Sequence, residues 1–287
     1  MGRVWIVVSF VVAISNFITL MFAPRLRAAL RKGRDWICSL REEQPCGFSE
    51  APPEWLRTGH PIVIAHAGGG IGHFVYTNSR EAIEASIARG VKVLEVDVCF
   101  TADGEPVLSH DFEPDGEIPF GVGQKPTLEQ FLSQKICGVL TPLTLRQLMN
   151  DSKKWGVSIF VDSKKGDAVR LAKWLAKEAH PERFRRWIFQ VTSEREVLAF
   201  RVAGIASSQL HFNAELRTAQ RAIPWMVRQG IRSVSLCVRQ IASAKDLQPF
   251  KEAGIHPFVW TVNHATTRQS ILDAGAAGYF TDWLIEH

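Results

Sequence analysis

From His60 onward, short apolar and β-branched runs alternate with segments whose apolar residues recur at helical spacing. Helical segments lie between most of the runs, for example at 79–89, 168–179, 218–229 and 266–274. This alternation is typical of an α/β fold with a parallel sheet, and eight units match a closed (β/α)₈ (TIM) barrel, which usually has about 250 residues. The predicted strands are 62–66, 92–97, 158–162, 187–191, 209–213, 233–236, 257–261 and 278–281.

A doubly wound open sheet is the alternative fold for the same pattern. Such sheets often carry a G-x-G-x-x-G turn after the first strand. Here Gly68, Gly69 and Gly70 are consecutive, so that signature is missing and the closed barrel is favoured.

The second strand departs from the regular alternation. It continues to Phe100, turns at Asp103-Gly104 and returns as 106–109, which predicts a β-hairpin that projects His110 back over the strand ends. Residues 111–145 then form an insertion rich in Gly, Pro and Phe, and long loops in compact domains are usually functional.

The first residues have a different pattern. The stretch 4–24 is uncharged and mostly apolar, and a helix of roughly 20 such residues spans the hydrocarbon core of a bilayer. We therefore expect a transmembrane anchor at 1–23, a basic juxtamembrane linker at 24–60 and the barrel domain at 61–287. A cleaved signal peptide is the main rival, but no A-x-A site follows the apolar part.

Charge refines this picture. The chain of 287 residues has a formal net charge of +5, while residues 1–34 hold six basic side chains and no acid, so the remainder carries about −1 by difference. This distribution does not support nucleic-acid binding, which needs basic residues across a folded surface. Basic residues directly after the apolar stretch favour a cytoplasmic location for the barrel. The five cysteines show no metal-binding spacing and do not indicate a disulfide framework.

Acidic side chains gather at the predicted mouth of the barrel. Glu95 and Asp97 are two positions apart on one strand and therefore share its inward face. Asp162 and Lys164 have the same spacing at the end of another strand, where barrel enzymes carry their active sites. Three converging carboxylates would repel one another unless a divalent cation neutralised them, and oxygen ligands favour Mg²⁺ or Ca²⁺ over zinc. Each acid alone could instead be a turn or surface residue.

Two histidines differ from the other seven because each ends an apolar strand run beside these acids. They are His66 and His110, and imidazoles with pKa values near neutral pH are suited to proton transfer. We interpret the remaining histidines as structural or surface residues.

These residues resemble one known family. The matching segments are Ile64-Ala65-His66, Asn78-Ser79, Leu94-Glu95-Val96-Asp97-Val98, Thr101-Ala102-Asp103-Gly104, Pro106 to Asp111, Asp162-Ser163-Lys164, Trp260-Thr261-Val262-Asn263 and Thr281-Asp282. In order and spacing, from about residue 62 to 283, they are similar to the glycerophosphodiester phosphodiesterases, a family of the phospholipase-C-like phosphodiesterases.

The resemblance implies a role for each matching residue. Glu95, Asp97 and Asp162 look like the ligands of the divalent metal, with Asp162 where relatives more often have glutamate. His66 and His110 look like the acid–base pair and Lys164 like a phosphate contact. We also place Trp260 and Asn263, at the end of a later strand, in the substrate pocket.

The chain departs from the family pattern at two positions. Ala67 stands where relatives usually have a phosphate-binding arginine, and Thr77 stands where they have an acid. The backbone N–H groups of Gly68 and Gly69 could bind the phosphate instead, because glycine loops form anion-binding nests.

The expected function is metal-dependent hydrolysis of a glycerophosphodiester or lysophospholipid to an alcohol and a phosphomonoester, in lipid metabolism beside a membrane. A catalytically silent barrel that binds phospholipid headgroups is one alternative, motivated by Ala67. A lyase that releases a cyclic phosphate is another. Apolar residues of the insertion either receive an acyl chain or pack locally; they include Phe112, Phe120, Phe131 and Leu132.

Overall fold

The computed structural model describes residues 56, 59–112, 125–163, 166–178 and 184–283. The predicted anchor at 1–23 and nearly all of the linker at 24–60 lie outside these residues. Within the described ranges, no helix is both long and apolar enough to cross a membrane. The membrane anchor therefore stays a prediction.

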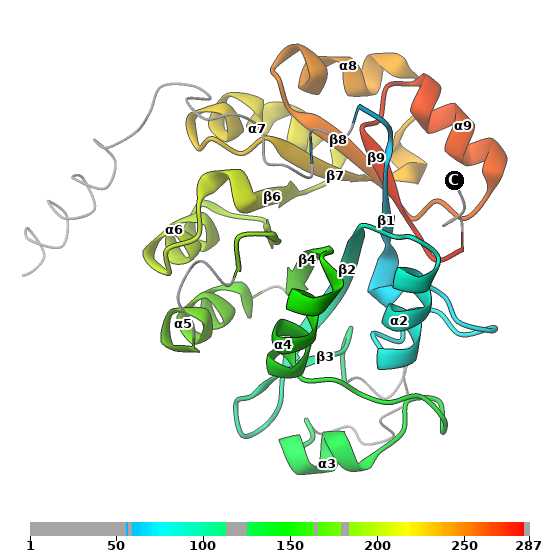
Figure 1. Cartoon of the computed structure of the whole chain (residues 1–287). Coiled ribbons are helices and arrows are strands. Elements are labelled where there is room, and N and C mark those ends of the chain that lie inside the picture. Colours follow the sequence, from blue (N-terminus) through cyan, green and yellow to red (C-terminus); the bar gives the residue numbers. More distant parts are fainter. Residues whose placement is uncertain (1–55, 57–58, 113–124, 164–165, 179–183, 284–287) are drawn as a thin grey trace, which may run out of the picture. The chain divides into compact units, whose positions relative to one another are not determined.

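Eight parallel strands form a closed ring in the described part of the chain. Their order is β1-β9-β8-β7-β6-β5-β4-β2, and the pairing of β1 with β2 closes the ring, with Ile64 opposite Val93. Figure 1 shows the first (blue) and last (red) strands side by side. The predicted barrel is confirmed and the open sheet is excluded. The strands are β1 (Ile62–Ala65), β2 (Val93–Phe100), β4 (Ser158–Ser163), β5 (Trp187–Val191), β6 (Leu210–Asn213), β7 (Ser233–Cys237), β8 (His256–Trp260) and β9 (Gly278–Thr281).

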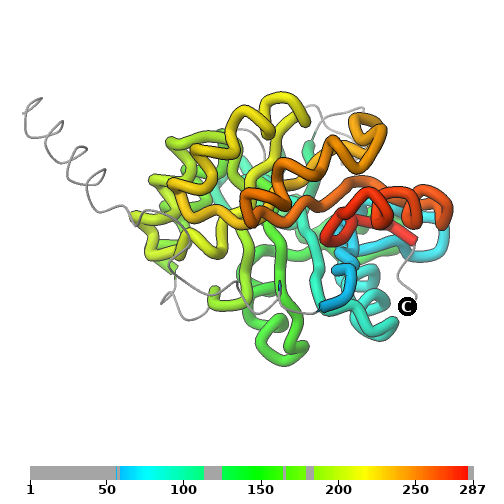
Figure 2. The backbone as a smooth tube through the Cα atoms, turned by 90° about the horizontal axis from the view of Figure 1, so that it is seen from above, coloured from blue at the N-terminus to red at the C-terminus, as the bar shows by residue number. Residues whose placement is uncertain are grey.

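Helices surround the outside of the strands (Figures 1 and 2). Four of them correspond to the helical segments predicted from spacing, namely α2, α5, α7 and α9. The described helices are η2 (His66–Gly68), α2 (Arg80–Ala88), α3 (Leu128–Ser133), α4 (Leu145–Trp155), α5 (Ala168–Glu178), α6 (Glu194–Val202), η4 (Ser207–Gln209), α7 (Leu216–Arg228), η5 (Val238–Gln240), α8 (Ala244–Glu252) and α9 (Ala265–Asp273).

Local sequence signals set the ends of these helices, as α4 illustrates. The Gln147 N–H donates to the Thr144 hydroxyl at 3.0 Å, and the Thr144 N–H donates back to the Gln147 side chain at 2.9 Å. This reciprocal capping satisfies two N–H groups that the first turn leaves without partners. The helix ends at Gly156, which adopts a left-handed φ of 66°.

Side-chain alternation along β2 divides the interior into two environments. Leu94 and Val96 pack outward in the large cluster between strands and helices, as predicted. Val93 points into the ring and joins an inner cluster with Ile62, Ile64, Phe160, Ile188, Phe258 and Phe280. Because Glu95 and Asp97 share the inward face of Val93, the acids lie above this apolar layer at the carboxyl end of the barrel.

The predicted hairpin is present. Strand β3 (Pro106–Leu108) runs antiparallel to β2, with Phe100 opposite Pro106, and Gly104 in the turn has a φ of 94°. The insertion packs beneath it, because Phe112 and Phe131 are buried together with Cys99, Val107, Ile136 and Leu140. These two aromatics therefore have a packing role. Phe120 lies outside the described residues.

Candidate active site

Three carboxylates, two of them buried and one partly buried, converge at the carboxyl end of two neighbouring strands. Glu95 and Asp97 come from β2, and Asp162 on β4 lies directly opposite Asp97 in the parallel pairing. One ligand oxygen from each of the three lies within 4.8 Å of the others. The structure thus brings together the three residues that the sequence proposed as metal ligands.

The electrostatics of this cluster favour a bound cation. Burial, together with the charges of Asp97 and Asp162, raises the pKa of Glu95 well above its ordinary value. Burial and the charge of Asp97 raise the pKa of Asp162 to about 7, although Gln190 donates a hydrogen bond to it. Three oxygen donors that resist ionising together fit a hard divalent cation such as Mg²⁺ or Ca²⁺, whose charge would remove their mutual repulsion.

The Nδ1 side of His66 contacts Asp282, which in turn is hydrogen-bonded to Asn263. His66 follows β1 directly, and its Nδ1 lies 3.0 Å from Asp282 Oδ1. The Asn263 side-chain amide donates to Asp282 Oδ2 at 2.6 Å, and the Asp282 N–H donates to Asn263 Oδ1 at 2.9 Å. When Asp282 is ionised, Nδ1 carries the proton and Nε2 keeps a lone pair available for the site.

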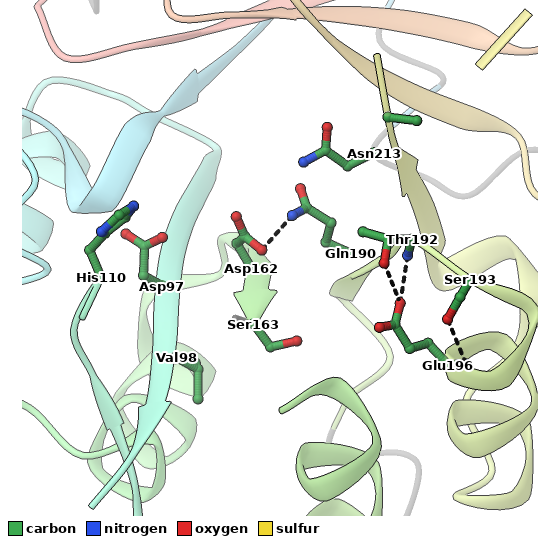
Figure 3. A pocket seen from close by; sticks show the side chains of 11 residues that line it. Asp97, Val98, His110, Asp162, Ser163, Gln190, Thr192, Ser193, Glu196 and Asn213 are labelled. Atoms are coloured by element: carbon green, nitrogen blue, oxygen red, sulfur yellow. Dashed lines mark hydrogen bonds between the residues drawn. The ribbon is translucent and has the colours of Figure 1, made fainter. Parts of the chain in front are cut away.

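His110 reaches the cluster from the hairpin side, as predicted. Figure 3 shows it beside Asp97. Its Nδ1 lies 2.7 Å from Asp111 Oδ2, and its side chain is 45% exposed, against 14% for His66. The charges of both histidines act on Asp162 and counter the rise in its pKa, so both lie within electrostatic reach of the acids.

Tyr76 lies between the two histidines, a position that sequence reasoning missed. Its ring meets His66 edge-on with centroids 4.5 Å apart, and the centroid of His110 is 6.1 Å away. Tyr76 adopts a left-handed φ of 57° in an irregular loop, where no periodic pattern could single it out.

Asn78 ties the loop after β1 to the acid cluster. Its side-chain amide donates to Asp97 Oδ2 at 2.9 Å, and its Oδ1 accepts from the Asp97 N–H at 2.9 Å. Its own N–H donates to the Ala67 carbonyl oxygen at 2.9 Å. Thr77, where the resemblance places an acid, is buried and hydrogen-bonds Ser79. Asn78 thus orients one carboxylate of the cluster.

The loop after His66 supports the cluster through its backbone. Ala67, at a φ of 46°, donates its N–H to Glu95 Oε2 at 2.6 Å. The Gly69 N–H donates to the His66 carbonyl oxygen and the Gly70 N–H to the Asp282 carbonyl oxygen, each at 2.7 Å. The phosphate-binding role of Gly68 and Gly69 stays a prediction, with the Gly69 N–H directed into the loop.

Of the other predicted site residues, Lys164 lies outside the described residues. Trp260, at the end of β8, has a side chain that is 36% exposed. Asn263 accepts from the Thr281 hydroxyl in addition to its contacts with Asp282. Both polar atoms of its carboxamide are therefore already hydrogen-bonded, so Asn263 affects the site through Asp282.

A cavity of about 580 Å³ extends sideways from the acids. Its lining starts at Asp97, His110 and Asp162 and continues to Thr192 and Asn213, at the ends of β5 and β6 (Figure 3). Trp260 and Asn263, the predicted substrate-pocket residues, are not part of this lining.

Sequence reasoning missed Gln190 and Asn213 in this lining. Their position near the carboxyl ends of predicted barrel strands is the signal that could have found them.

Comparison with known proteins shows a similarity to one family over part of the chain. The family model for the "Glycerophosphoryl diester phosphodiesterase family" matches residues 69–117, which include Glu95, Asp97 and His110. No curated protein matches the sequence.

Solved structures share the fold at low sequence identity. A putative glycerophosphoryl diester phosphodiesterase from Silicibacter pomeroyi DSS-3 has a TM-score of 0.63 and 18% identity, covering 80% of this chain and 93% of its own. An Oleispira antarctica phosphodiesterase in complex with the product sn-glycerol-3-phosphate has a TM-score of 0.63 and 17% identity, covering 80% and 96%. A glycerophosphodiester phosphodiesterase from Thermotoga maritima has a TM-score of 0.60 and 21% identity, covering 78% and 95%.

The family-model match includes Gly69, Gly70, two of the acids and His110, and the barrel brings Asp162 and His66 to the same place. The chain is therefore similar to the glycerophosphoryl diester phosphodiesterase family in sequence over residues 69–117, and it shares the fold of solved glycerophosphodiester phosphodiesterases over about four fifths of its length.

Proposed function

We propose that this protein hydrolyses glycerophosphodiesters to an alcohol and a phosphomonoester, with the help of a divalent cation. The observation that carries the proposal is the convergence of three carboxylates with two histidines at the mouth of the barrel. Neither set alone would suffice, because hydrolysis of a phosphodiester needs charge stabilisation on the phosphate and two proton transfers.

Glu95, Asp97 and Asp162 would hold the cation, with Mg²⁺ or Ca²⁺ favoured by their oxygen donors. When bound, the cation would supply positive charge that attracts the non-bridging oxygens of the phosphate. Asn78 keeps Asp97 in place through two hydrogen bonds. Ala67 does the same for Glu95 through its N–H.

The surroundings of the two histidines support different roles. His66 is largely buried and has the Asp282 carboxylate at Nδ1, so its Nε2 would take a proton from the attacking water and Asp282 would stabilise the imidazolium. His110 is more exposed, and its Nδ1 lies 2.7 Å from Asp111 Oδ2. It would donate a proton to the departing alkoxide.

The substrate class is supported by a neighbour and by the packing of the insertion. The Oleispira antarctica phosphodiesterase holds sn-glycerol-3-phosphate as its product, and an ester of that group is the simplest substrate here as well. Phe112 and Phe131 are already buried against each other and their cluster, so they offer no surface to an acyl chain.

Lysophospholipids are the second candidate substrate, and the uncharged apolar stretch at 4–24 is the observation that favours them. A transmembrane anchor at 1–23, with the barrel on the cytoplasmic side, would place the site beside lipid. This anchor and its orientation belong to the proposal.

The test is to identify the phosphorus product by ³¹P NMR after incubation with Mg²⁺ or Ca²⁺ and either glycerophosphocholine or lysophosphatidylcholine. We expect a phosphomonoester from glycerophosphocholine. Detection of a cyclic phosphate would instead show that the reaction is the lyase reaction and not hydrolysis. No turnover of either compound, together with binding of both, would favour a headgroup-binding barrel.

A further inference from the structure

The cavity beside the acids changes character along its length. Its inner end is formed by the carboxylates of Asp97 and Asp162, whereas its outer wall is formed by Gln190, Thr192, Ser193, Glu196 and Asn213. All but Glu196 are neutral side chains that form hydrogen bonds, and Glu196 accepts two hydrogen bonds from Thr192. At about 580 Å³ the cavity has the size of an ordinary small-molecule site, so it has room beyond a phosphate group.

The hydrogen-bonding capacity of this outer wall is only partly used. In the part of the chain that the structure describes, no group makes a hydrogen bond with the Asn213 carboxamide. Gln190 donates through Nε2 to Asp162, and no described residue donates to its Oε1. The carboxamides of Gln190 and Asn213 extend into the same space in Figure 3.

A third polar atom at the cavity is buried without a partner. Among the residues that the structure describes, the Ser163 hydroxyl, next to Asp162, has no hydrogen-bond partner. Thr192 differs, because its N–H and hydroxyl both donate to Glu196 Oε2, at 2.6 and 3.0 Å. Polar groups without partners in a partly closed site are costly unless a ligand or water satisfies them. The unused groups therefore point to a ligand with several hydroxyls.

The composition of the lining argues against other substituents. Among the described residues that line the cavity there is no Phe, Tyr or Trp, which a quaternary ammonium group would favour, and the carboxylate of Glu196 would repel an anionic substituent. Only Val98 and Ala214 are apolar, which is too little for an acyl chain. A neutral polyol fits better than any of these.

We propose that the outer wall binds the alcohol portion of the diester, that this portion is a neutral polyol, and that Asn213 is a specificity-determining residue for it. The carboxamide would both donate to and accept from neighbouring hydroxyls. This inference rests on the proposed hydrolysis and deepens it by naming the substituent beyond the phosphate. The wall would thus favour glycerol-like over choline-like alcohols.

The test compares two glycerophosphodiesters that differ only in this alcohol with a chromogenic diester that contains no polyol. Steady-state kinetics of the full chain with divalent cation are measured on glycerophosphoglycerol, glycerophosphocholine and bis(p-nitrophenyl) phosphate. In Asn213→Leu we expect KM for glycerophosphoglycerol to rise about 10-fold, the effect of losing one or two hydrogen bonds. KM for glycerophosphocholine and for the chromogenic diester should stay nearly unchanged.

Two further variants support this comparison. Asn150→Leu makes the same change on an exposed position of α4 and should leave all three substrates unaffected. Asn213→Ser replaces the carboxamide with one hydroxyl that can still hydrogen-bond, so it should show a smaller loss than Asn213→Leu, which also guards against misfolding of the leucine variant. An equal change on all three substrates, or no change on any, would overturn the assignment of Asn213.

Failure of the proposed hydrolysis gives a different result. If the wild-type chain turns over none of the three compounds, calorimetric titration with glycerophosphoglycerol and glycerophosphocholine still decides the inference. Binding of the polyol diester that weakens in Asn213→Leu would support it. Equal binding of both compounds to both proteins would contradict it.

Discussion

His66 Nδ1 lies 3.0 Å from Asp282 Oδ1, although 216 positions separate the two residues. The pairing follows from closure of the barrel. Ala65 on β1 is opposite Thr281 on β9, so the next residue of each strand leaves the sheet at the same point. The first and last strands thus build one half of the proposed acid–base machinery together.

This pairing predicts a loss of activity in Asp282→Asn. The substitution keeps the shape of the side chain but removes the charge that orients His66 and stabilises its protonated form. We expect kcat to fall by roughly 10²–10⁴, with a shifted acidic limb in the pH–rate profile. Asp273→Asn, an exposed change on α9, should match wild type. An unaltered pH profile in Asp282→Asn would remove Asp282 from the mechanism.

The two histidines should each be needed for turnover. His66→Ala and His110→Ala are expected to lower kcat by roughly 10²–10⁴, the usual effect of losing a general acid or base. His264→Ala, at an exposed position before α9, is the control. Steady-state rates on glycerophosphocholine check this, and wild-type turnover in either variant would return that histidine to a structural role.

Chelation should abolish activity, and the metal-free chain should become less stable as the pH rises. The pKa of Asp162 is raised from 3.8 to about 7 by burial and by Asp97. Between these values the folded chain binds more protons than the unfolded chain. The contribution of Asp162 is therefore present below pH 3.8 and is lost as the pH rises to about 7.

Urea unfolding in EDTA measures this contribution as the difference between wild type and Asp162→Asn. The stability of wild type relative to that of Asp162→Asn should fall as the pH rises from 4 to 7. Adding Mg²⁺ or Ca²⁺ to the chelated wild-type protein at neutral pH should restore both its activity and its stability. Full turnover after exhaustive chelation would exclude a role for the metal.

His211 predicts the opposite dependence of stability on pH. It is fully buried among aromatic rings beneath the site, where burial lowers its pKa from 6.5 to about 3. The folded chain therefore binds fewer protons between these values, and stability is lost as the pH falls from 6.5 towards 3, by up to about 1.4 kcal/mol per pH unit.

The variant that isolates this effect is His211→Phe combined with Ser233→Ala, because the Ser233 hydroxyl is the partner of His211 Nδ1 at 2.8 Å. The acid dependence of its unfolding free energy should be weaker than that of wild type. The contributions of His211 and Asp162 overlap in pH with opposite signs, so only these variant differences separate them. Parallel pH curves would show that His211 titrates normally.

Removal of residues 1–34 should leave a soluble, folded enzyme, because the barrel carries its own inner and outer hydrophobic clusters. We expect kcat on glycerophosphocholine to be unchanged and activity on lysophospholipid in vesicles to fall, since the proposed anchor supplies proximity. Equal vesicle activity with and without these residues would argue against the anchor's role.

Much of the architecture is local and could therefore be predicted. The period of two in β2 places Glu95 and Asp97 on one face whatever the rest of the chain does. Thr144 and Gln147 determine where α4 starts, and Asp103-Gly104 determines where the hairpin turns. The eight strand–helix units indicate closure because few folds accommodate them.

The remaining features depend on contacts between segments far apart in sequence. Neither the Asp282 carboxylate behind His66 nor the Asn78 amide on Asp97 follows from spacing, because each needs the register in which β1 meets β2 and β9. The burial of Phe112 and Phe131 required the hairpin to be in place first. By itself the sequence determined which residues face inward on each strand, since that is a property of the backbone. Only the tertiary structure decided which inward residues meet, because hydrogen bonds act over about 3 Å and closure of the ring sets those distances.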